Sequence, residues 1–262
     1  MEKCLILFDI DETLYLNHER RIPESTLIAL AKLKAAGHTL AVATGRAPFE
    51  INETIKNLPF DFFILNNGQY VLQNGKVIYE NPIEPATIKA LMADAKDAHI
   101  CLGFSSATRS TVTGVNDLIH HIFTHSDLTY PKVDPTIVET ENIFQVWFFS
   151  EDYPAYAKKY EEKVRFVPWL DNGSDIIPTG ASKATGLLKT IEANHHKLPK
   201  KIVFFGDGAN DIELVELADI GIAMGNAVDP LKEKADFITK NIEDDGIYYA
   251  CEQLGLFEKE QL

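Results

Sequence analysis

The stretch "CLILFDIDETL", residues 4–14, begins with a run of apolar residues and ends in a group of acids. A continuous apolar run of this length is typical of a strand that is covered on both faces of its sheet. Asp9, Asp11 and Glu12 follow within four positions, and like charges crowded at the end of a buried strand repel one another and resist desolvation. The stretch therefore predicts either a solvated turn or a site where something positive offsets the acids.

The residues around this stretch alternate between strand and helix patterns. After the first strand, the sequence predicts a helix over 23–37, a strand over 38–45, a helix over 48–58 and a strand over 61–68. The alternation returns near the end of the chain, where strands are predicted at 201–208, 220–225 and 236–239. Strands separated by helices imply a parallel, doubly wound sheet. The predicted fold class is therefore α/β, with a Rossmann-like core.

The middle of the chain has a different pattern. A helix is predicted over 86–99, and strand-like pieces rich in β-branched and aromatic residues follow at 101–106, 110–114 and 143–150. Strands adjacent in sequence are expected to pair antiparallel, as in α+β domains. We therefore predict a discontinuous core domain made of residues 1–83 and 179–262, with an α+β domain of residues 84–178 inserted into it.

Composition limits the partners and the compartment. The 25 basic and 39 acidic residues give a net charge of −14, which argues against nucleic acid or an anionic membrane as partner. Cys4, Cys101 and Cys251 have neither zinc spacing nor the pattern of a disulfide framework, which favours a reducing compartment. The sequence has no secretory leader pattern and no apolar run long enough to span a membrane. We therefore expect a cytoplasmic protein, and no obligate protein partner is indicated.

Polar residues collect where the predicted core strands end. In open parallel sheets, ligands bind beyond the carboxyl ends of the strands. The residues at these ends, together with a lysine that opens a predicted helix, are Asp9, Asp11, Thr44, Gly45, Lys183, Asp207, Asn210 and Asp211. If the strands are neighbours, one pocket gathers several carboxylates with a threonine, a lysine and an asparagine.

Such a group of carboxylates needs a cation. Two like charges 4 Å apart repel by about 4 kcal/mol at an effective dielectric constant near 20. A hard dication would offset this repulsion, and an all-oxygen donor set points to Mg²⁺ rather than zinc. Together with Lys183 the ion would make a positive site suited to a phosphate, although no Walker-type nucleotide loop is present. A carboxylate beside the metal can attack phosphorus, and a second one can serve as general acid and base.

Four motifs in order, "DIDETL", "ATGR", "SK" and "GDGANDIEL…ADIGIAMGNA", resemble those of the haloacid dehalogenase-like (HAD) phosphatases. Within them the chain resembles the Cof-type subfamily, whose type IIB cap is inserted between the second and third motifs, and the resemblance spans nearly the whole chain. It implies a Mg²⁺-dependent phosphatase that acts on small phosphorylated metabolites, either sugar phosphates or phosphorylated cofactors, through an aspartyl-phosphate.

The resemblance also implies a role for each motif residue. Asp9 would be the nucleophile and Asp11 the general acid and base. At the implied metal site, Asp9, Asp11 (through its backbone carbonyl) and Asp207 would bind the ion, and Asp211 would support the site, often through water. The implied phosphate-binding residues are Thr44, Gly45, Lys183 and Asn210. Glu12 stands where many members have glycine, so we expect a small change beside the site and no loss of chemistry.

Two other functions stay open at this point. A phosphomutase would pass the phosphoryl group to a sugar, and a non-enzymatic regulator would use the pocket as a phospho-acceptor or metabolite-binding site. The acid and base Asp11 argues against a regulator, which has no use for fast hydrolysis. Arg46 is left open between a substrate contact and a surface ion pair. His120, His121 and His125 lack acidic or cysteine partners nearby and are expected to be surface or substrate-facing residues.

Overall fold

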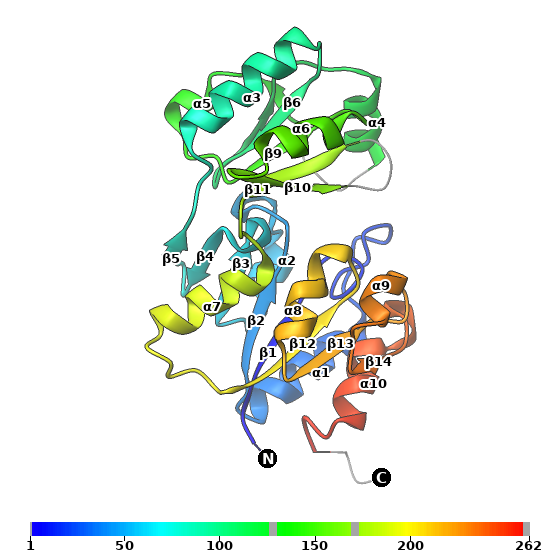
Figure 1. Ribbon diagram of the computed structural model, residues 1–262. Helices are drawn as coiled ribbons and strands as arrows, with labels where there is room; N and C mark the ends of the chain where they lie inside the picture. Colours follow the sequence, from blue (N-terminus) through cyan, green and yellow to red (C-terminus); the bar gives the residue numbers. More distant parts are fainter. Residues whose placement is uncertain (1, 126–129, 169–172, 259–262) are drawn as a thin grey trace. The chain divides into compact units, whose positions relative to one another are not determined.

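The chain forms two compact units. The computed structural model describes residues 2–125, 130–168 and 173–258 (Figure 1). The first unit comprises Met1–Gly45, Glu53–Tyr79 and Ser182–Leu262, and the second comprises Arg46–Asn52 and Glu80–Ala181. The second unit is thus inserted into the first along the chain. The short segment Arg46–Asn52, which the sequence analysis assigned to the core, groups with the second unit.

The first unit is built on an eight-stranded sheet with the order β14-β13-β12-β1-β2-β3-β4-β5. The strands from β14 to β3 pair parallel, and β4 pairs antiparallel with β3. The strands are β1 (Cys4–Phe8), β2 (Thr39–Ala43), β3 (Phe62–Leu65), β4 (Tyr70–Gln73), β5 (Lys76–Glu80), β12 (Lys201–Gly206), β13 (Ile220–Ala223) and β14 (Phe237–Ile238). The α/β fold class with a parallel sheet is thereby confirmed.

The apolar run that opens the chain forms β1 in the interior of this sheet. All five of its residues are buried, as expected for a strand covered on both faces. Phe8 pairs with Phe205 on β12 and with Val42 on β2, so the three strands end at nearly the same level. The helices of this unit are α1 (Glu24–Ala35), α2 (Glu53–Lys56), α7 (Lys183–Ala193), α8 (Ile212–Leu217), α9 (Asp229–Lys232) and α10 (Gly246–Gln253).

Some elements differ from the prediction. The helix predicted over 48–58 is wrong: the chain forms a 3₁₀ turn, Pro48–Glu50, then an extended residue, Ile51, and then α2. The Glu50 carboxylate accepts a hydrogen bond from the Ala47 N–H (2.7 Å), which caps the short turn and competes with a longer helix. The β4 and β5 strands, joined through Asn74-Gly75 with φ of 51° and 72°, were not predicted either. That Asn-Gly pair is a usable hairpin signal.

The second unit has a six-stranded sheet with the order β10-β11-β9-β6-β7-β8. Its pairs are antiparallel, as expected for strands adjacent in sequence, except that β7 and β8 pair parallel. The strands are β6 (Leu102–Ser105), β7 (Ser110–Val112), β8 (Lys132–Val133), β9 (Gln145–Phe148), β10 (Val164–Pro168) and β11 (Ser174–Pro178). The helices are α3 (Pro85–Asp97), α4 (Asp117–His125), α5 (Ile137–Thr140) and α6 (Tyr153–Tyr160).

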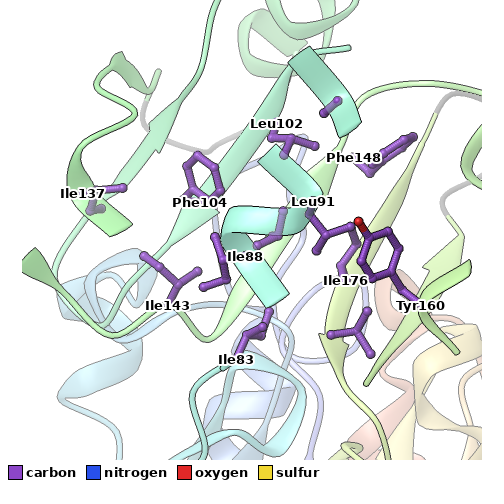
Figure 2. Close-up of a cluster of buried hydrophobic side chains, with 13 residues drawn as sticks. Ile83, Ile88, Leu91, Leu102, Phe104, Ile137, Ile143, Phe148, Tyr160 and Ile176 are labelled. Atoms are coloured by element: carbon purple, nitrogen blue, oxygen red, sulfur yellow. The ribbon is translucent and has the colours of Figure 1, made fainter. Parts of the chain in front are cut away.

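The second unit has a hydrophobic core of its own. Leu91 from α3, Phe104 from β6 and Phe148 from β9 lie in one buried cluster with Ile83 and Ile176 (Figure 2). Every member of this cluster belongs to the second unit. The core therefore depends on contacts within the inserted segment. Among the described residues, no helix is both long and apolar enough to cross a membrane.

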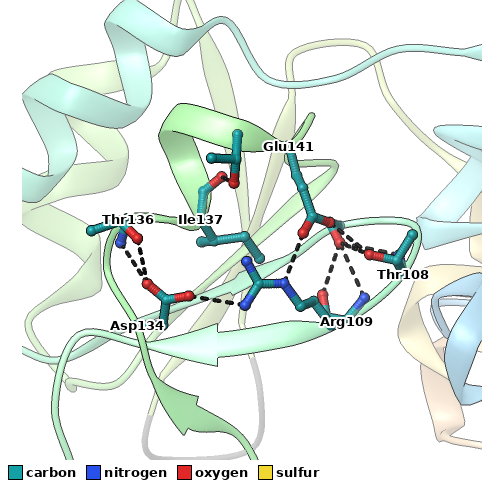
Figure 3. A network of polar contacts seen from close by, with 8 residues as sticks. Thr108, Arg109, Asp134, Thr136, Ile137 and Glu141 are labelled. Carbon is teal, nitrogen blue, oxygen red and sulfur yellow. Dashed lines mark hydrogen bonds and ion pairs between the residues drawn. The ribbon is translucent and has the colours of Figure 1, made fainter.

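A polar network fixes the turn between β6 and β7 (Figure 3). Arg109 Nε donates to Glu141 Oε1 (2.7 Å), and its Nη1 donates to Asp134 Oδ2 (2.9 Å). Thr108 Oγ1 also donates to Glu141, at 2.7 Å from Oε2. The network ties the turn to the segments that flank α5. Because Arg109 is partly exposed to solvent, the network serves the shape of this turn more than the stability of the unit.

Candidate active site

The loop after β1 is a tight turn that carries the first acids. The Asp9 N–H donates to the carbonyl of Phe205 (2.9 Å), which holds Asp9 level with the end of β12. The N–H groups of Leu14 and Tyr15 both donate to the carbonyl of Ile10 (2.9 and 2.8 Å), and Asp11 forms an isolated bridge with Tyr15. The loop therefore returns on itself directly after the strand.

Glu12 has a left-handed backbone in this turn, with φ of 54°. A residue with a Cβ atom pays roughly 1–2 kcal/mol for that conformation, whereas glycine adopts it freely. This explains why glycine suits the position. The Glu12 side chain is also used, because its Oε1 accepts a hydrogen bond from the Asn17 N–H (3.2 Å).

Lys183 joins two acids that are far apart in the chain. Its Nζ lies 2.8 Å from Asp9 Oδ1 and 2.7 Å from Asp211 Oδ1, and the lysine is only 1% exposed. It is the first residue of α7, whose N-cap Ser182 accepts a hydrogen bond from the Thr185 N–H (3.1 Å). The cap fixes the first turn of the helix and so aims the lysine at the sheet edge.

The segment after β12 supplies two more carboxylates. Asp211 Oδ2 accepts hydrogen bonds from the N–H groups of Asp207 (3.0 Å) and Gly208 (2.9 Å), which fold the segment into a compact turn. Thr13 Oγ1, from the loop after β1, donates to Asp207 Oδ1 (2.8 Å). One oxygen each from Asp9, Asp207 and Asp211 lie within 4.8 Å of one another. The arrangement offers three oxygen ligands to one cation.

The electrostatics of this group favour a bound cation. Burial, together with the neighbouring Asp211 and Asp207, raises the pKa of Asp9 well above its ordinary value, and Lys183 only partly offsets this. Burial and then Asp211 raise the pKa of Asp207 to about 7. Burial by itself would lower the pKa of Lys183, but Asp211 and Asp9 outweigh it and raise that pKa. One lysine is thus set against three crowded carboxylates, and an oxygen-loving cation fits the charge that is left.

The predicted phosphate-binding residues lie at the same sheet edge. Thr44 follows β2, is fully buried, and donates its N–H to the carbonyl of Ile64 (2.9 Å). Gly45 comes next, and a Cβ atom added there would lie 3.3 Å from the side chain of Asn67. Asn210, in the turn after β12, donates from Nδ2 to Asn67 Oδ1 (3.0 Å). The segments that hold Thr44, Gly45 and Asn210 therefore meet beside β1.

The sequence left open the roles of Arg46 and of the three histidines at 120, 121 and 125. These residues belong to the second unit. Arg46 is 7% exposed and donates to the carbonyl of Glu50 (3.3 Å), so it is not a surface residue. His120 and His121 are exposed on α4, which agrees with the expectation of surface residues. The side chain of His125 lies outside the described residues.

The sequence of this chain is similar to those of known hydrolases. Residues 6–251 match the family described as haloacid dehalogenase-like hydrolase. The chain belongs to this family. It is also 38% identical to a Bacillus subtilis (strain 168) protein named "Putative phosphatase YkrA", over 98% of this chain and 100% of that protein.

Two more distant relatives carry more specific names. The chain is 29% identical to pyridoxal phosphate phosphatase YbhA of Escherichia coli (strain K12), over 94% of this chain and 97% of the relative. The solved structure of the HAD subclass IIB sugar phosphatase BT4131 superimposes with a TM-score of 0.84 at 28% identity, covering 97% of this chain and 100% of the other. The chain is therefore a HAD-like hydrolase of the phosphatase type.

The site of this HAD-like hydrolase contains residues that the sequence analysis did not single out. Thr13 binds Asp207, and Asn226 joins two loops, since its Nδ2 donates to the carbonyl of Glu12 (2.8 Å) and its Oδ1 accepts from the Ile242 N–H (3.0 Å). Asn67 accepts a hydrogen bond from Asn210, and its side chain lies 3.3 Å from where a Cβ atom on Gly45 would be. Thr13 could have been found because it lies inside the "DIDETL" motif. Asn226 could have been found in the same way, because it lies in the "ADIGIAMGNA" part of the fourth motif. Asn67 carries no local signal beyond being a turn residue.

Proposed function

We propose that the protein is a Mg²⁺-dependent phosphomonoesterase that hydrolyses small phosphorylated metabolites through an aspartyl-phosphate on Asp9. The observation that carries the proposal is the pair of short contacts from buried Lys183 to Asp9 and Asp211, inside a group of three carboxylates at the end of a parallel sheet. The positive charges of the buried lysine and of a divalent cation would together offset these carboxylates and allow the site to bind a phosphate.

Asp9 has one carboxylate oxygen available for attack. Its Oδ1 contacts Lys183, whereas its Oδ2 has no hydrogen-bond or ion-pair partner among residues 2–125, 130–168 and 173–258. In the proposed first step, Oδ2 forms a bond to phosphorus while the bond from phosphorus to the ester oxygen breaks. The protonated carboxyl of Asp11 gives its proton to the leaving oxygen.

The second step reverses the role of Asp11. Its carboxylate takes a proton from a water molecule, whose oxygen attacks phosphorus and displaces Asp9, so that inorganic phosphate leaves and the carboxylate of Asp9 is restored. Lys183, Thr44, Asn210 and the backbone N–H of Gly45 are proposed to hold the phosphoryl oxygens throughout. Because these groups carry positive charge or hydrogen-bond donors, they favour the charge that develops on those oxygens.

The metal is proposed to lie between the acids. Carboxylates of Asp9, Asp207 and Asp211 and the backbone carbonyl of Asp11 would hold it, and an all-oxygen set suits Mg²⁺. When bound, the ion supplies Lewis-acid stabilisation of the phosphoryl oxygens. Thr13 keeps Asp207 in place through its hydroxyl.

The proposed substrates are sugar phosphates or phosphorylated cofactors. The sugar phosphatase BT4131 and pyridoxal phosphate phosphatase YbhA, which match nearly all of this chain, support this range. We propose that the second unit acts as the cap that selects the leaving group and excludes water. A cytoplasmic location belongs to the same proposal and rests on the three free cysteines, Cys4, Cys101 and Cys251.

The test is phosphate release from a panel of phosphorylated sugars, phosphorylated cofactors and an aryl phosphate, with Mg²⁺ and with a chelator. We expect release that requires Mg²⁺ and that falls by more than about 1,000-fold in Asp9→Asn, because the nucleophile is lost. Asp97→Asn, an exposed acid in the second unit, is the matched control and should keep full activity.

Three outcomes would contradict parts of the proposal. Hydrolysis by Asp9→Asn at the rate of the unmodified protein would refute the nucleophile. An isomerised sugar phosphate in place of free phosphate would favour a phosphomutase. A protein that releases phosphate from no ester at all would refute the proposed function.

A further inference from the structure

The loop that follows β3 has an unusual backbone. Asn66, Asn67 and Gly68 all have positive φ, at 49°, 52° and 91°, and all three are buried. Asparagine tolerates the left-handed region better than most residues that carry a Cβ atom, and glycine adopts it freely. The sequence Asn-Asn-Gly therefore suits a loop that must turn tightly inside the protein.

This loop contacts three segments that contain proposed phosphate-binding residues. Asn67 Oδ1 accepts a hydrogen bond from Asn210 Nδ2 (3.0 Å) across 143 positions of sequence. A Cβ atom added to Gly45 would lie 3.3 Å from both Nδ2 and Oδ1 of Asn67. A Cβ atom on Gly68 would lie 2.0 Å from the carbonyl oxygen of Ser182, directly before Lys183. The loop of Asn67 and Gly68 thus lies where the segments of Gly45, Lys183 and Asn210 meet.

The side-chain amide of Asn67 has an unused hydrogen-bond donor, Nδ2, within the described residues. Its Oδ1 is used by Asn210, but its Nδ2 has no hydrogen-bond partner among the residues that the structure describes. The residue is only 3% exposed. The Nδ2 atom is not closed off from solvent, so its N–H groups are open to a bound acceptor beside Gly45 and Asn210.

Asn210 presents a second donor of the same kind. Its Nδ2 carries two N–H groups, and within the described part of the chain only one of them is used, toward Asn67. The two amides therefore form a pair, linked by one hydrogen bond, with N–H groups to spare on both members. Beside Gly45 and the segment of Lys183, the acceptor that such donors suit is an anionic oxygen.

We propose that Asn67 is a further phosphate-binding residue, which donates from Nδ2 to a phosphoryl oxygen while its Oδ1 orients Asn210. The inference rests on the proposed function, since it takes the occupant of the site to be a phosphate ester. It adds a donor from the β3 segment to those that follow β2 and β12.

The test uses two substitutions that keep the left-handed backbone. Asn67→Asp keeps an acceptor for Asn210 but replaces the donor by a negatively charged oxygen. We expect kcat/KM for an aryl phosphate in Mg²⁺ to fall by more than about 100-fold, and inhibition by inorganic phosphate to weaken in parallel. Asn67→Gly removes the amide altogether and should lower kcat/KM by about 10- to 100-fold.

The matched control is Asn74→Asp. Asn74 also has a left-handed backbone, with φ of 51°, but it is exposed in the turn between β4 and β5. This variant should keep the kcat/KM and the phosphate inhibition of the unmodified protein. Thermal unfolding of each variant distinguishes a folded, inactive protein from an unfolded one.

A folded Asn67→Asp with unchanged kcat/KM and unchanged phosphate inhibition would overturn the inference and leave Asn67 a loop residue. Should Asn67→Asp unfold, Asn67→Gly decides in the same way, because glycine is unstrained at this backbone. Failure of the proposed function looks different, since the unmodified protein would then hydrolyse no phosphate ester.

Discussion

At the scale of single residues, Lys183 is the buried cation of the site. It is fully enclosed and contacts a carboxylate on each of two segments, those of Asp9 and Asp211. A buried ion pair gains little over an apolar contact of the same shape, but removal of one partner leaves a charge uncompensated. Lys183 is therefore expected to matter for both stability and phosphate binding.

We predict that Lys183→Met lowers the free energy of unfolding by about 3–5 kcal/mol, because Asp9 and Asp211 lose their buried cation. The same variant should lose activity toward an aryl phosphate. Chemical denaturation and phosphate release measure the two effects. Lys189→Met is the control on the same helix, because the ion pair of Lys189 with Glu192 is exposed, and it should change neither.

A Lys183→Met protein that is as stable as the unmodified one in metal-free buffer would contradict this account. It would mean that the acids are neutral in the folded state without the lysine.

Sequence alone predicted much at the residue scale, for a physical reason. Strand ends at one edge of a parallel sheet are brought together by topology, so that Asp9, Lys183 and Asp211 could be expected to meet, and the structure brings them together. The catalytic, phosphate-binding and metal-binding roles of these residues stay predictions. Asn67 could not be found in this way, because its partner Asn210 is 143 positions away and "NNG" reads only as a turn.

At the scale of elements, the position of α7 depends on two glycines. A Cβ atom added to Gly186, in the second turn of the helix, would lie 2.6 Å from the Cα atom of Gly68. The helix can therefore approach the loop after β3 only because neither residue has a side chain. This approach places Lys183, one turn earlier, at the sheet edge.

We predict that Gly186→Ala destabilises the protein and lowers its activity. In a free helix, alanine is better than glycine by roughly 1 kcal/mol. Here the added methyl group meets Gly68 and Ile64, so overpacking should cost about 1–3 kcal/mol and should displace Lys183. Thermal unfolding and phosphate release are the measurements.

The control for this prediction is Lys189→Ala on the same helix, which should leave both quantities unchanged. A rise in the melting temperature of Gly186→Ala would contradict the close approach of helix and loop.

Helices and strands were predicted correctly where the sequence of a segment is sufficient to determine its structure. The apolar runs of β1, β2, β3 and β12 and the periodic pattern of α1 are local signals, and these elements form near the predicted positions. The helix expected over 48–58 fails because the Glu50 side chain caps a short turn. The parallel pairing of β7 with β8 is not local, since their residues are brought together across α4.

For the whole molecule, the main feature is that each unit has a core of its own. The cluster of Leu91, Phe104 and Phe148 is confined to the second unit, whereas β1 and its neighbours are buried within the first. A substitution that destabilises one core should therefore increase unfolding first in that unit. Multi-domain proteins often depart from two-state unfolding for this reason.

We predict that Phe104→Ala costs about 3–5 kcal/mol in the second unit, because it leaves a cavity at a fully buried position. Amide hydrogen exchange should quicken in β6, β9 and β11 while β1 and β12 stay protected. Phe62→Ala, on β3, is the counterpart in the first unit and should show the reverse pattern. Equal acceleration in both units would contradict separate cores.

The central claim is that Asp9 takes up the phosphoryl group. The most direct measurement uses Asp11→Asn, in which loss of the base should slow hydrolysis of the intermediate. The variant reacts briefly with an aryl phosphate in Mg²⁺, because an aryl leaving group can depart without the proton that Asp11 gives. Acid-quenched peptide mapping by mass spectrometry then locates the phosphoryl group. The account predicts one added phosphoryl group, located on Asp9 and absent from the Asp9→Asn, Asp11→Asn double variant. A phosphoryl group on another residue, or turnover without any covalent intermediate, would contradict it.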